Sequence, residues 1–255
     1  MDLIDTHCHL YLKEFDEDRV EVVQRAENEG VKKLILPSID KEHFRDLLKM
    51  EAEFPHLCLA MAGLHPCSVR ENYKEELEFV AELLSLRTFA AVGEIGLDFY
   101  WDKGFEKQQY AAFHAQIDMA LVTGIPIVIH SRASMQPTID VVRAHQFGDL
   151  RGIFHCFSDS AEAARQIIDL GFYLGIGGVI TFKNSKLPDI LANIDLQHIV
   201  LETDAPYLTP APFRGKRNES SYLTIIAEKL AEIKGIPVEE VSKITTANAL
   251  KIFGG

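Results

Sequence analysis

The chain has 255 residues, of which 47% are hydrophobic and 25% charged, a composition typical of a soluble globular protein. Its formal net charge of −12 argues against a protein that holds nucleic acid through a broad basic surface, so any such binding must be local and metal-assisted. No apolar run approaches the roughly 20 residues of a membrane span, and the N-terminus lacks the basic and apolar regions of a signal peptide. We therefore expect a cytoplasmic protein without a membrane partner.

No linker rich in Pro, Ser or Gly and no low-complexity tract divides the sequence. We therefore expect one domain over residues 1–255, and we expect a monomer.

Short apolar runs alternate with helical patterns along the chain. The runs, each predicted to be a strand, lie at residues 4–10, 33–38, 57–66, 89–98, 126–132, 152–158, 173–182 and 198–207. The helical patterns lie at residues 15–29, 43–53, 75–84, 108–122, 135–145, 161–170, 187–192, 222–233 and 238–252. Near-continuous apolar strands separated by helices predict a parallel sheet covered by helices.

Eight strand and helix units in about 250 residues favour an α/β fold of the (β/α)8 TIM barrel type, a parallel eight-stranded barrel surrounded by helices. The alternative is an open doubly wound sheet, which would be expected to carry a phosphate-binding GxGxxG after its first strand. The sequence has no such motif there, and GIGG at 175–178 lies within or just after the seventh run with no proper helix start behind it.

The first run, LIDTHCHL at residues 3–10, carries two histidines two positions apart. Because alternate side chains of a strand share a face, His7 and His9 are expected to lie together, in the geometry of half a metal site. A surface strand with two exposed histidines is the other interpretation, and the histidines alone do not decide between the two.

Chemically reactive side chains recur at the ends of the runs. His7 and His9 end the first run, His65 the third, His130 the fifth and Asp204 the eighth, while Glu94 lies late in the fourth and His155 within the sixth. In a (β/α)8 barrel these strand ends meet at one mouth, where the active site lies. A single histidine on an apolar strand is more often a core residue, but that explanation is much weaker when it must be repeated at successive strands.

Three or four imidazoles with two or more carboxylates suit a binuclear site for divalent ions. Two ions about 3.5–4 Å apart need a bridging oxygen ligand, and Glu94 is the natural candidate. Asp204 is the natural base, because it is placed to orient or deprotonate a water whose pKa a metal has lowered.

Several motifs make the chain resemble the TatD-type metal-dependent hydrolases, usually called TatD deoxyribonucleases, within the amidohydrolase-like barrel superfamily. They are DTHCHL at 5–10, GLHP at 63–66, GEIGLDFY at 93–100, QxxxFxxQ seen as Gln109, Phe113 and Gln116, PIVIHSR at 126–132, GIFHCFS at 152–158, ETDAPYLTP at 202–210, RGKRNE at 214–219 and NALKIFG at 248–254. The resemblance runs nearly end to end, and ETDAPYL together with HCFS is highly specific.

The resemblance implies a (β/α)8 barrel that binds two divalent metal ions and hydrolyses phosphodiester bonds of DNA as a deoxyribonuclease or exonuclease. The implied ligands are His7, His9, Glu94, His130, His155 and Asp204, with Glu94 as the bridge. Mg²⁺ or Mn²⁺ is the expected functional metal, and Zn²⁺ stays open. DNA ends or short single-stranded nucleic acid are the implied substrates.

Two positions depart from the family pattern. Ala133 follows HSR where the family often has an acidic residue, which leaves the substrate contacts after the fifth run undefined. Ser220 stands where the family often has proline, at an expected helix start for which Asn218 is the predicted N-cap.

Residues outside the ligand set give weaker signals. Arg132, Arg214, Lys216 and Arg217 are candidates to hold phosphate, although for the last three a solvated charge run is an equal alternative. His65 is a candidate donor to a phosphate oxygen or leaving group, and Glu202 a candidate to orient a ligand histidine. The aromatic residues at 99–101 suit either base stacking or packing against the barrel.

Two other functions stay open at this point. The first is a lactonase, phosphotriesterase or amidohydrolase that acts on a small molecule from the same barrel. The second is a metal-binding scaffold without turnover, against which the intact base Asp204 argues.

Overall fold

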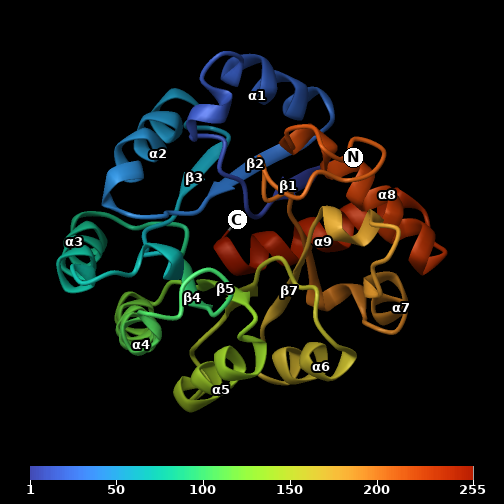
Figure 1. Ribbon diagram of the computed structural model, residues 1–255. Coiled ribbons are helices and arrows are strands. Elements are labelled where there is room, and N and C mark those ends of the chain that lie inside the picture. The colour runs from blue at the N-terminus through green and yellow to red at the C-terminus, as the bar shows by residue number, and fades with distance from the viewer. Residues whose placement is uncertain (255) are drawn as a thin grey trace.

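A ring of eight strands organises the molecule, whose computed structural model describes residues 1–254 (Figure 1). The strands are β1 (Leu3–Asp5), β2 (Val31–Leu36), β3 (Cys58–Ala60), β4 (Val92–Asp98), β5 (Ile127–Arg132), β6 (Gly152–Phe154), β7 (Tyr173–Ile176) and β8 (Ile199–Leu201). They pair in parallel and in chain order, β1 to β3 in one ladder and β4 to β8 in another.

Backbone hydrogen bonds join the two ladders at both seams. Ala62 pairs with Val92 in a parallel bridge between the third and fourth strands. At the other seam the amide of Thr6 donates to the carbonyl of Leu201 at 3.1 Å. The predicted (β/α)8 barrel is therefore confirmed, with its strands in sequence order around the ring.

Helices surround the ring (Figure 1). They are α1 (Arg19–Asn28), α2 (Lys41–Glu53), α3 (Tyr73–Leu86), α4 (Glu106–Thr123), α5 (Met135–His145), α6 (Ala161–Asp169), α7 (Leu187–Leu191) and α8 (Leu223–Lys234), followed by α9 (Val238–Phe253). Most predicted helices agree with these bounds to within two residues, but the first begins at Arg19 rather than at residue 15. Within residues 1–254, no helix is both long and apolar enough to cross a membrane.

Several strands are shorter than the apolar runs that predicted them. β1 and β8 have only three residues each, so His7, His9 and Asp204 lie beyond the strand ends rather than on the strands. After β8 the backbone is no longer extended, and Asp204 adopts a left-handed conformation with φ of 56°. The predicted neighbourhood of the two histidines nevertheless holds, since the ring centroids of His7 and His9 are 5.1 Å apart.

Inward-facing side chains fill the barrel. Helix α9 covers the end where the strands begin (Figure 1). The buried interior cluster comprises Ile4, Ile35, Met61, Ala91, Val128, Ile153, Val200, Ala249 and Ile252. The last two residues come from α9, whose Asn248 side chain donates to the carbonyls of Leu196 and Ile199 at 2.8 and 2.7 Å. The opposite end, where the strands finish, is left for a functional site.

We predict that Asn248→Ala destabilises the protein by about 1–3 kcal/mol, because it removes the two buried hydrogen bonds that the side chain donates to the carbonyls of Leu196 and Ile199. Lys251→Ala, on an exposed position of the same helix, is the matched control and should stay within about 0.5 kcal/mol of wild type. Urea unfolding of both variants measures the difference. Equal unfolding free energies would show that this side chain does not fasten α9 to the barrel.

Candidate metal centre

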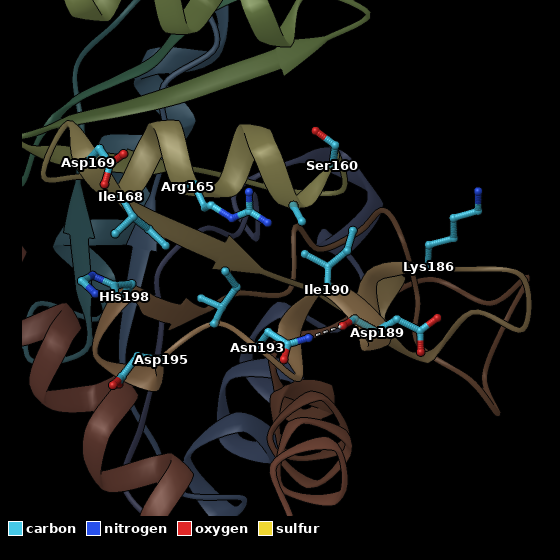
Figure 2. Close-up of a pocket in the computed structure, with 12 residues that line it drawn as sticks. Ser160, Arg165, Ile168, Asp169, Lys186, Asp189, Ile190, Asn193, Asp195 and His198 are labelled. Atoms are coloured by element: carbon cyan, nitrogen blue, oxygen red, sulfur yellow. Dashed lines mark hydrogen bonds between the residues drawn. The ribbon is translucent and has the colours of Figure 1, made fainter.

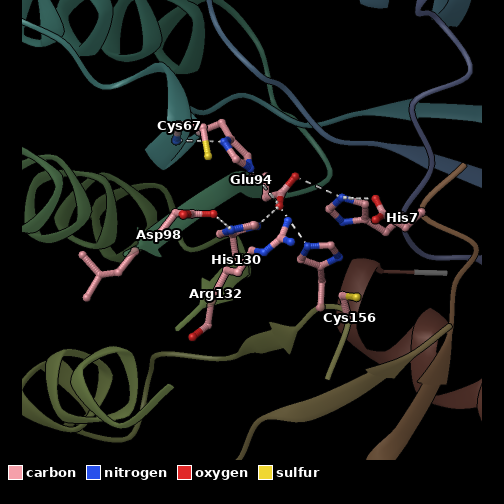
Figure 3. A network of polar contacts seen from close by, with 12 residues as sticks. His7, Cys67, Glu94, Asp98, His130, Arg132 and Cys156 are labelled. Atoms are coloured by element: carbon pink, nitrogen blue, oxygen red, sulfur yellow. Dashed lines mark hydrogen bonds and ion pairs between the residues drawn. The ribbon is translucent and has the colours of Figure 1, made fainter. Parts of the chain in front are cut away.

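A single buried carboxylate, that of Glu94 on β4, lies at the centre of the mouth (Figure 3). Five imidazoles approach it: on Oε1, His130 Nδ1 at 2.8 Å, His155 Nε2 at 2.9 Å and His65 Nε2 at 3.2 Å, and on Oε2, His7 Nε2 at 3.1 Å and His9 Nε2 at 3.7 Å. These histidines follow or lie on four different strands. The strand ends therefore converge as the barrel predicts.

Asp204 completes the group from the end of β8. Its Oδ1 lies 3.8 Å from His7 Nε2 and 3.7 Å from His9 Nε2. Its backbone amide donates to the carbonyl of His7 at 2.9 Å, which ties the two segments together.

The six residues predicted as metal ligands are thus brought together. Three overlapping triads have all their ligand atoms within 4.8 Å of one another: His7, His9 and Glu94; His7, His155 and Asp204; and Glu94, His130 and His155. Imidazole nitrogen with carboxylate oxygen is a donor set that suits divalent ions of the zinc, iron and manganese type. The triads overlap, because His7, Glu94 and His155 each belong to two of them.

The two acidic groups differ in electrostatic environment. Burial works against ionisation of Glu94, but the neighbouring His155, His65 and His7 hold its pKa well below the ordinary value. Burial raises the pKa of Asp204 to about 8, against the opposing effect of His155. The ionised form of Asp204 therefore needs added positive charge, which a divalent cation would supply.

Hydrogen bonds fix the proton of His9 on the nitrogen that faces away from the site. The hydroxyl of Tyr11 donates to the carbonyl of Pro37 at 2.7 Å, so it accepts from His9 Nδ1 at 3.0 Å. Burial lowers the pKa of His9 well below its ordinary value, so the ring is neutral. Nε2 then presents its lone pair to the site, as a metal ligand must.

His65 has the opposite tautomer. Its Nδ1 accepts the backbone N–H of Cys67 at 3.0 Å, and burial lowers its pKa, so the ring is neutral with its proton on Nε2. That nitrogen lies 3.2 Å from Glu94 Oε1. The geometry thus supports the predicted role of His65 as a donor rather than a metal ligand.

His130 and His155 each lie between Glu94 and a second carboxylate. His130 Nε2 is 2.9 Å from Asp98 Oδ2, and His155 Nδ1 is 3.3 Å from Glu202 Oε1. Burial opposes protonation of both rings, but the flanking carboxylates raise both pKa values. Carboxylates in this position orient ligand histidines. Glu202 therefore lies where the sequence predicted an orienting residue, whereas Asp98 was missed although it closes the GLD segment of the fourth run.

Glycine at 175 makes room for Glu202, which is fully buried. A Cβ at Gly175 would overlap Glu202 Oε2, and the other oxygen, Oε1, accepts the backbone N–H of Cys156 at 2.6 Å. The first glycine of the GIGG segment thus admits a carboxylate behind His155, a role that the sequence alone did not reveal.

Two glutamines of the QxxxFxxQ motif hold the backbone beside the site. Gln109 accepts from the amide of Asp98 at 2.8 Å and donates to its carbonyl at 3.0 Å. Gln116 does the same to Leu64, at 2.6 and 3.2 Å, immediately before His65. Buried on α4, they fix two loops of the mouth.

Asp5 joins the ends of β1 and β8. Its buried carboxylate accepts from the amides of His7 at 3.3 Å and Thr203 at 2.9 Å, and from the hydroxyls of Thr203 and Ser220 at 2.6 Å each. Ser220 thus supplies a donor that a proline in its place would lack. The predicted N-cap role of Asn218 is wrong: α8 begins at Leu223, and the Asn218 amide donates to the carbonyls of Thr203 and Tyr207 instead.

A cavity of about 780 Å³ opens above these groups. Its lining includes His9, His65, Glu94, His130, His155, Asp204, Trp101, Arg132 and Tyr207. A second cavity of about 790 Å³ lies between α6 and α7, lined by residues such as Arg165 and Asp189 (Figure 2). It contains none of the predicted ligands.

The predicted phosphate-binding arginines lie in different surroundings. Arg132 lines the cavity, but among residues 1–254 the lining includes neither Arg214 nor Arg217. Arg214 packs on the Phe182 ring at 3.7 Å. Arg217 makes a two-pronged ion pair with Asp18 at 2.7 and 2.8 Å. The Arg217 guanidinium is thus already paired with a carboxylate. Of these three arginines, only Arg132 is placed to meet a ligand in the cavity.

We predict that Gly175→Ala lowers the affinity for Mn²⁺ by about 10- to 100-fold, because the added methyl displaces the carboxylate that orients His155. Gly177→Ala is the matched control, since its Cβ would meet the Glu202 carbonyl oxygen at an ordinary 3.5 Å. Calorimetric titration with Mn²⁺ compares the two variants. Equal affinities would mean that Glu202 does not support the site.

Known proteins share both the sequence and the fold. The family model described as TatD related DNase matches residues 4–254. The metal-dependent hydrolase YabD of Bacillus subtilis is 38% identical over 98% of each chain, and the metal-dependent hydrolase TatD of Mycobacterium tuberculosis is 35% identical over 99% of this chain and 98% of its own. The crystal structure of the TatD homologue YjjV from Escherichia coli superposes with a TM-score of 0.93 at 30% identity, covering 99% of this chain and 98% of that one. The chain belongs to the TatD family of metal-dependent hydrolases.

Proposed function

We propose that this chain is a deoxyribonuclease of the exonuclease type, which hydrolyses phosphodiester bonds at DNA ends or in short single-stranded nucleic acid. The observation that carries the proposal is the buried carboxylate of Glu94 among five imidazoles, with Asp204 across the same group. The family description as DNase-related supports the choice of bond. The cytoplasmic location, the single domain over residues 1–255 and the monomeric state stay predictions.

Two divalent ions, Mg²⁺ or Mn²⁺ with Zn²⁺ as a third choice, would be held by His7, His9, Glu94, His130, His155 and Asp204, with Glu94 shared between them. When bound there, such ions act as Lewis acids toward a phosphoryl oxygen and lower the pKa of water. The protein supplies the closed pocket and the oriented ligands, because Tyr11, Asp98 and Glu202 hold three of the histidines from behind.

Asp204 and His65 then have separate roles, the first as a base and the second as a hydrogen-bond donor. Asp204, ionised beside the cations, takes the proton of the attacking water, because its carboxylate lies across the group from Glu94 and near His7 and His9. His65, a neutral imidazole with its proton on Nε2, donates a hydrogen bond to a phosphoryl oxygen or to the leaving oxygen, and the proton that Asp204 has taken passes to the leaving group. The two residues come from different strands: His65 faces Glu94 Oε1, and Asp204 faces His7 and His9.

A substrate panel tests the bond that is cleaved. Labelled single-stranded DNA, an acyl lactone and a phosphotriester are each incubated with Mg²⁺, Mn²⁺ or Zn²⁺, and with a chelator as control. We predict metal-dependent DNA cleavage that chelation abolishes, while circular dichroism stays unchanged because the barrel core does not depend on the ions. Lactone or phosphotriester hydrolysis without DNA cleavage would favour the small-molecule alternative, and metal binding without any turnover would favour a scaffold.

We predict that Asp204→Asn lowers kcat by at least about 10²- to 10⁴-fold, as for a lost general base, and leaves much of the metal content, because the amide oxygen can still coordinate. His155→Ala removes a ligand and should lower both metal content and kcat. Asp189→Asn, on α7 away from the mouth, is the control. Near wild-type turnover of Asp204→Asn with full metal would assign the base to another residue, with His65 and Glu202 next to be tested.

A further inference from the structure

Arg132 is isolated among acidic groups. Of the lysines and arginines in the part of the chain that the structure describes, it alone lines the cavity above the candidate metal centre, together with Glu94, Asp98 and Asp204. It lies on β5 two positions after His130, so the two side chains share a face, about 6.6 Å apart along the strand. Figure 3 shows both residues.

The guanidinium of Arg132 is held in place without being neutralised. Within residues 1–254 it makes no ion pair and no side-chain hydrogen bond; instead it lies over the Tyr100 ring at 4.1 Å and the Trp101 ring at 5.1 Å. Stacking on aromatic rings orders a guanidinium and keeps its charge available, unlike the pairing of Arg217 with Asp18. Arg132 therefore offers an ordered, unpaired cation at the cavity wall.

Asp98 links this aromatic support to the metal centre. Its Oδ1 accepts the backbone amides of Tyr100 and Trp101 at 2.9 and 3.0 Å, and its Oδ2 faces His130 Nε2 at 2.9 Å. One carboxylate thus sets the position of a predicted ligand, His130, and of the loop whose rings support Arg132. The loop rings are still 59% and 67% exposed, so they remain free to stack on a flat ligand.

We propose that Arg132 binds a second phosphate of the substrate, next to the one being cleaved, while Trp101 stacks on the adjoining base. This inference rests on the proposed phosphodiesterase function. The rings of Tyr100 and Trp101 hold the guanidinium, and it makes no ion pair with Glu94 or Asp98, so its charge is available to an anion that lies over the aromatic loop. The site then selects an oligonucleotide over a single phosphodiester, and this contact offsets the repulsion expected from a net charge of −12.

The test varies the charge of the protein and of the substrate together. The substrates are a trinucleotide with two phosphodiesters, its two isomers in which either linkage is a neutral methylphosphonate, and bis(p-nitrophenyl) phosphate, which has one phosphate. For wild type, a neutral methylphosphonate next to the cleaved phosphodiester should lower kcat/KM by about 10- to 100-fold, mainly by raising KM. This is the size expected for a lost charge-assisted hydrogen bond. Arg132→Gln should lower kcat/KM for the all-phosphate trinucleotide by a similar factor and should show no further loss with the neutral isomer.

Arg143→Gln on α5, which changes an exposed arginine that pairs with Asp140, is the matched control. In this variant the neutral linkage should lower kcat/KM as much as it does in wild type. Two results would overturn the inference. The first is an equal loss of kcat/KM by Arg132→Gln on all four substrates, which would place Arg132 on the scissile phosphate. The second is that the methylphosphonate lowers kcat/KM of Arg132→Gln as much as it lowers that of wild type. If wild type hydrolyses none of these phosphodiesters, the proposed function itself is wrong. If wild type hydrolyses bis(p-nitrophenyl) phosphate but the effect of the neutral linkage does not depend on Arg132, only the further inference is wrong and the proposed function stands.

Discussion

The burial of Glu94 is the constraint on which the mouth of this barrel depends. An ionised carboxylate away from water costs several kcal/mol unless positive or hydrogen-bonding partners surround it. Here five imidazoles supply those partners. Four of the imidazoles have a further contact behind the ring: a hydroxyl for His9, a backbone amide for His65, and a second carboxylate for His130 and for His155. The buried Nδ1 of His7 has no partner among the described residues. Contacts of this kind orient ligand histidines toward a metal.

Residues at one end of the barrel determine its stability, and residues at the other end form the candidate metal centre. The end where the strands begin is closed by α9 and by apolar side chains such as Ile4 and Val200, so changes there act on stability. The end where the strands finish collects charged and polar groups that stability alone would not select. Asp5 connects these two roles, since its carboxylate holds the ends of β1 and β8 in register and thereby places His7 beside Asp204.

The sequence was sufficient for the fold and for the gathering of the six predicted ligands, because parallel strands in a barrel end at one mouth whatever their individual lengths. It was insufficient where a role depends on a partner far along the chain. Asp98, Gln109 and Gln116 act through specific contacts that no local pattern announces, and Arg217 is paired with Asp18, 199 residues away. The sequence also overestimated the lengths of β1 and β8. Beyond their ends, the side chain of Asp5 accepts the backbone amides of His7 and Thr203, although the predicted runs continue.

Anomalous diffraction from crystals soaked in Mn²⁺ tests the central claim, that Glu94 is the shared ligand of a two-ion centre, most directly. We predict two peaks about 3.5–4 Å apart, one on each side of the Glu94 carboxylate, with His7 and His9 at one peak and His130 at the other. A single peak, or peaks that leave Glu94 outside the coordination of either ion, would contradict it.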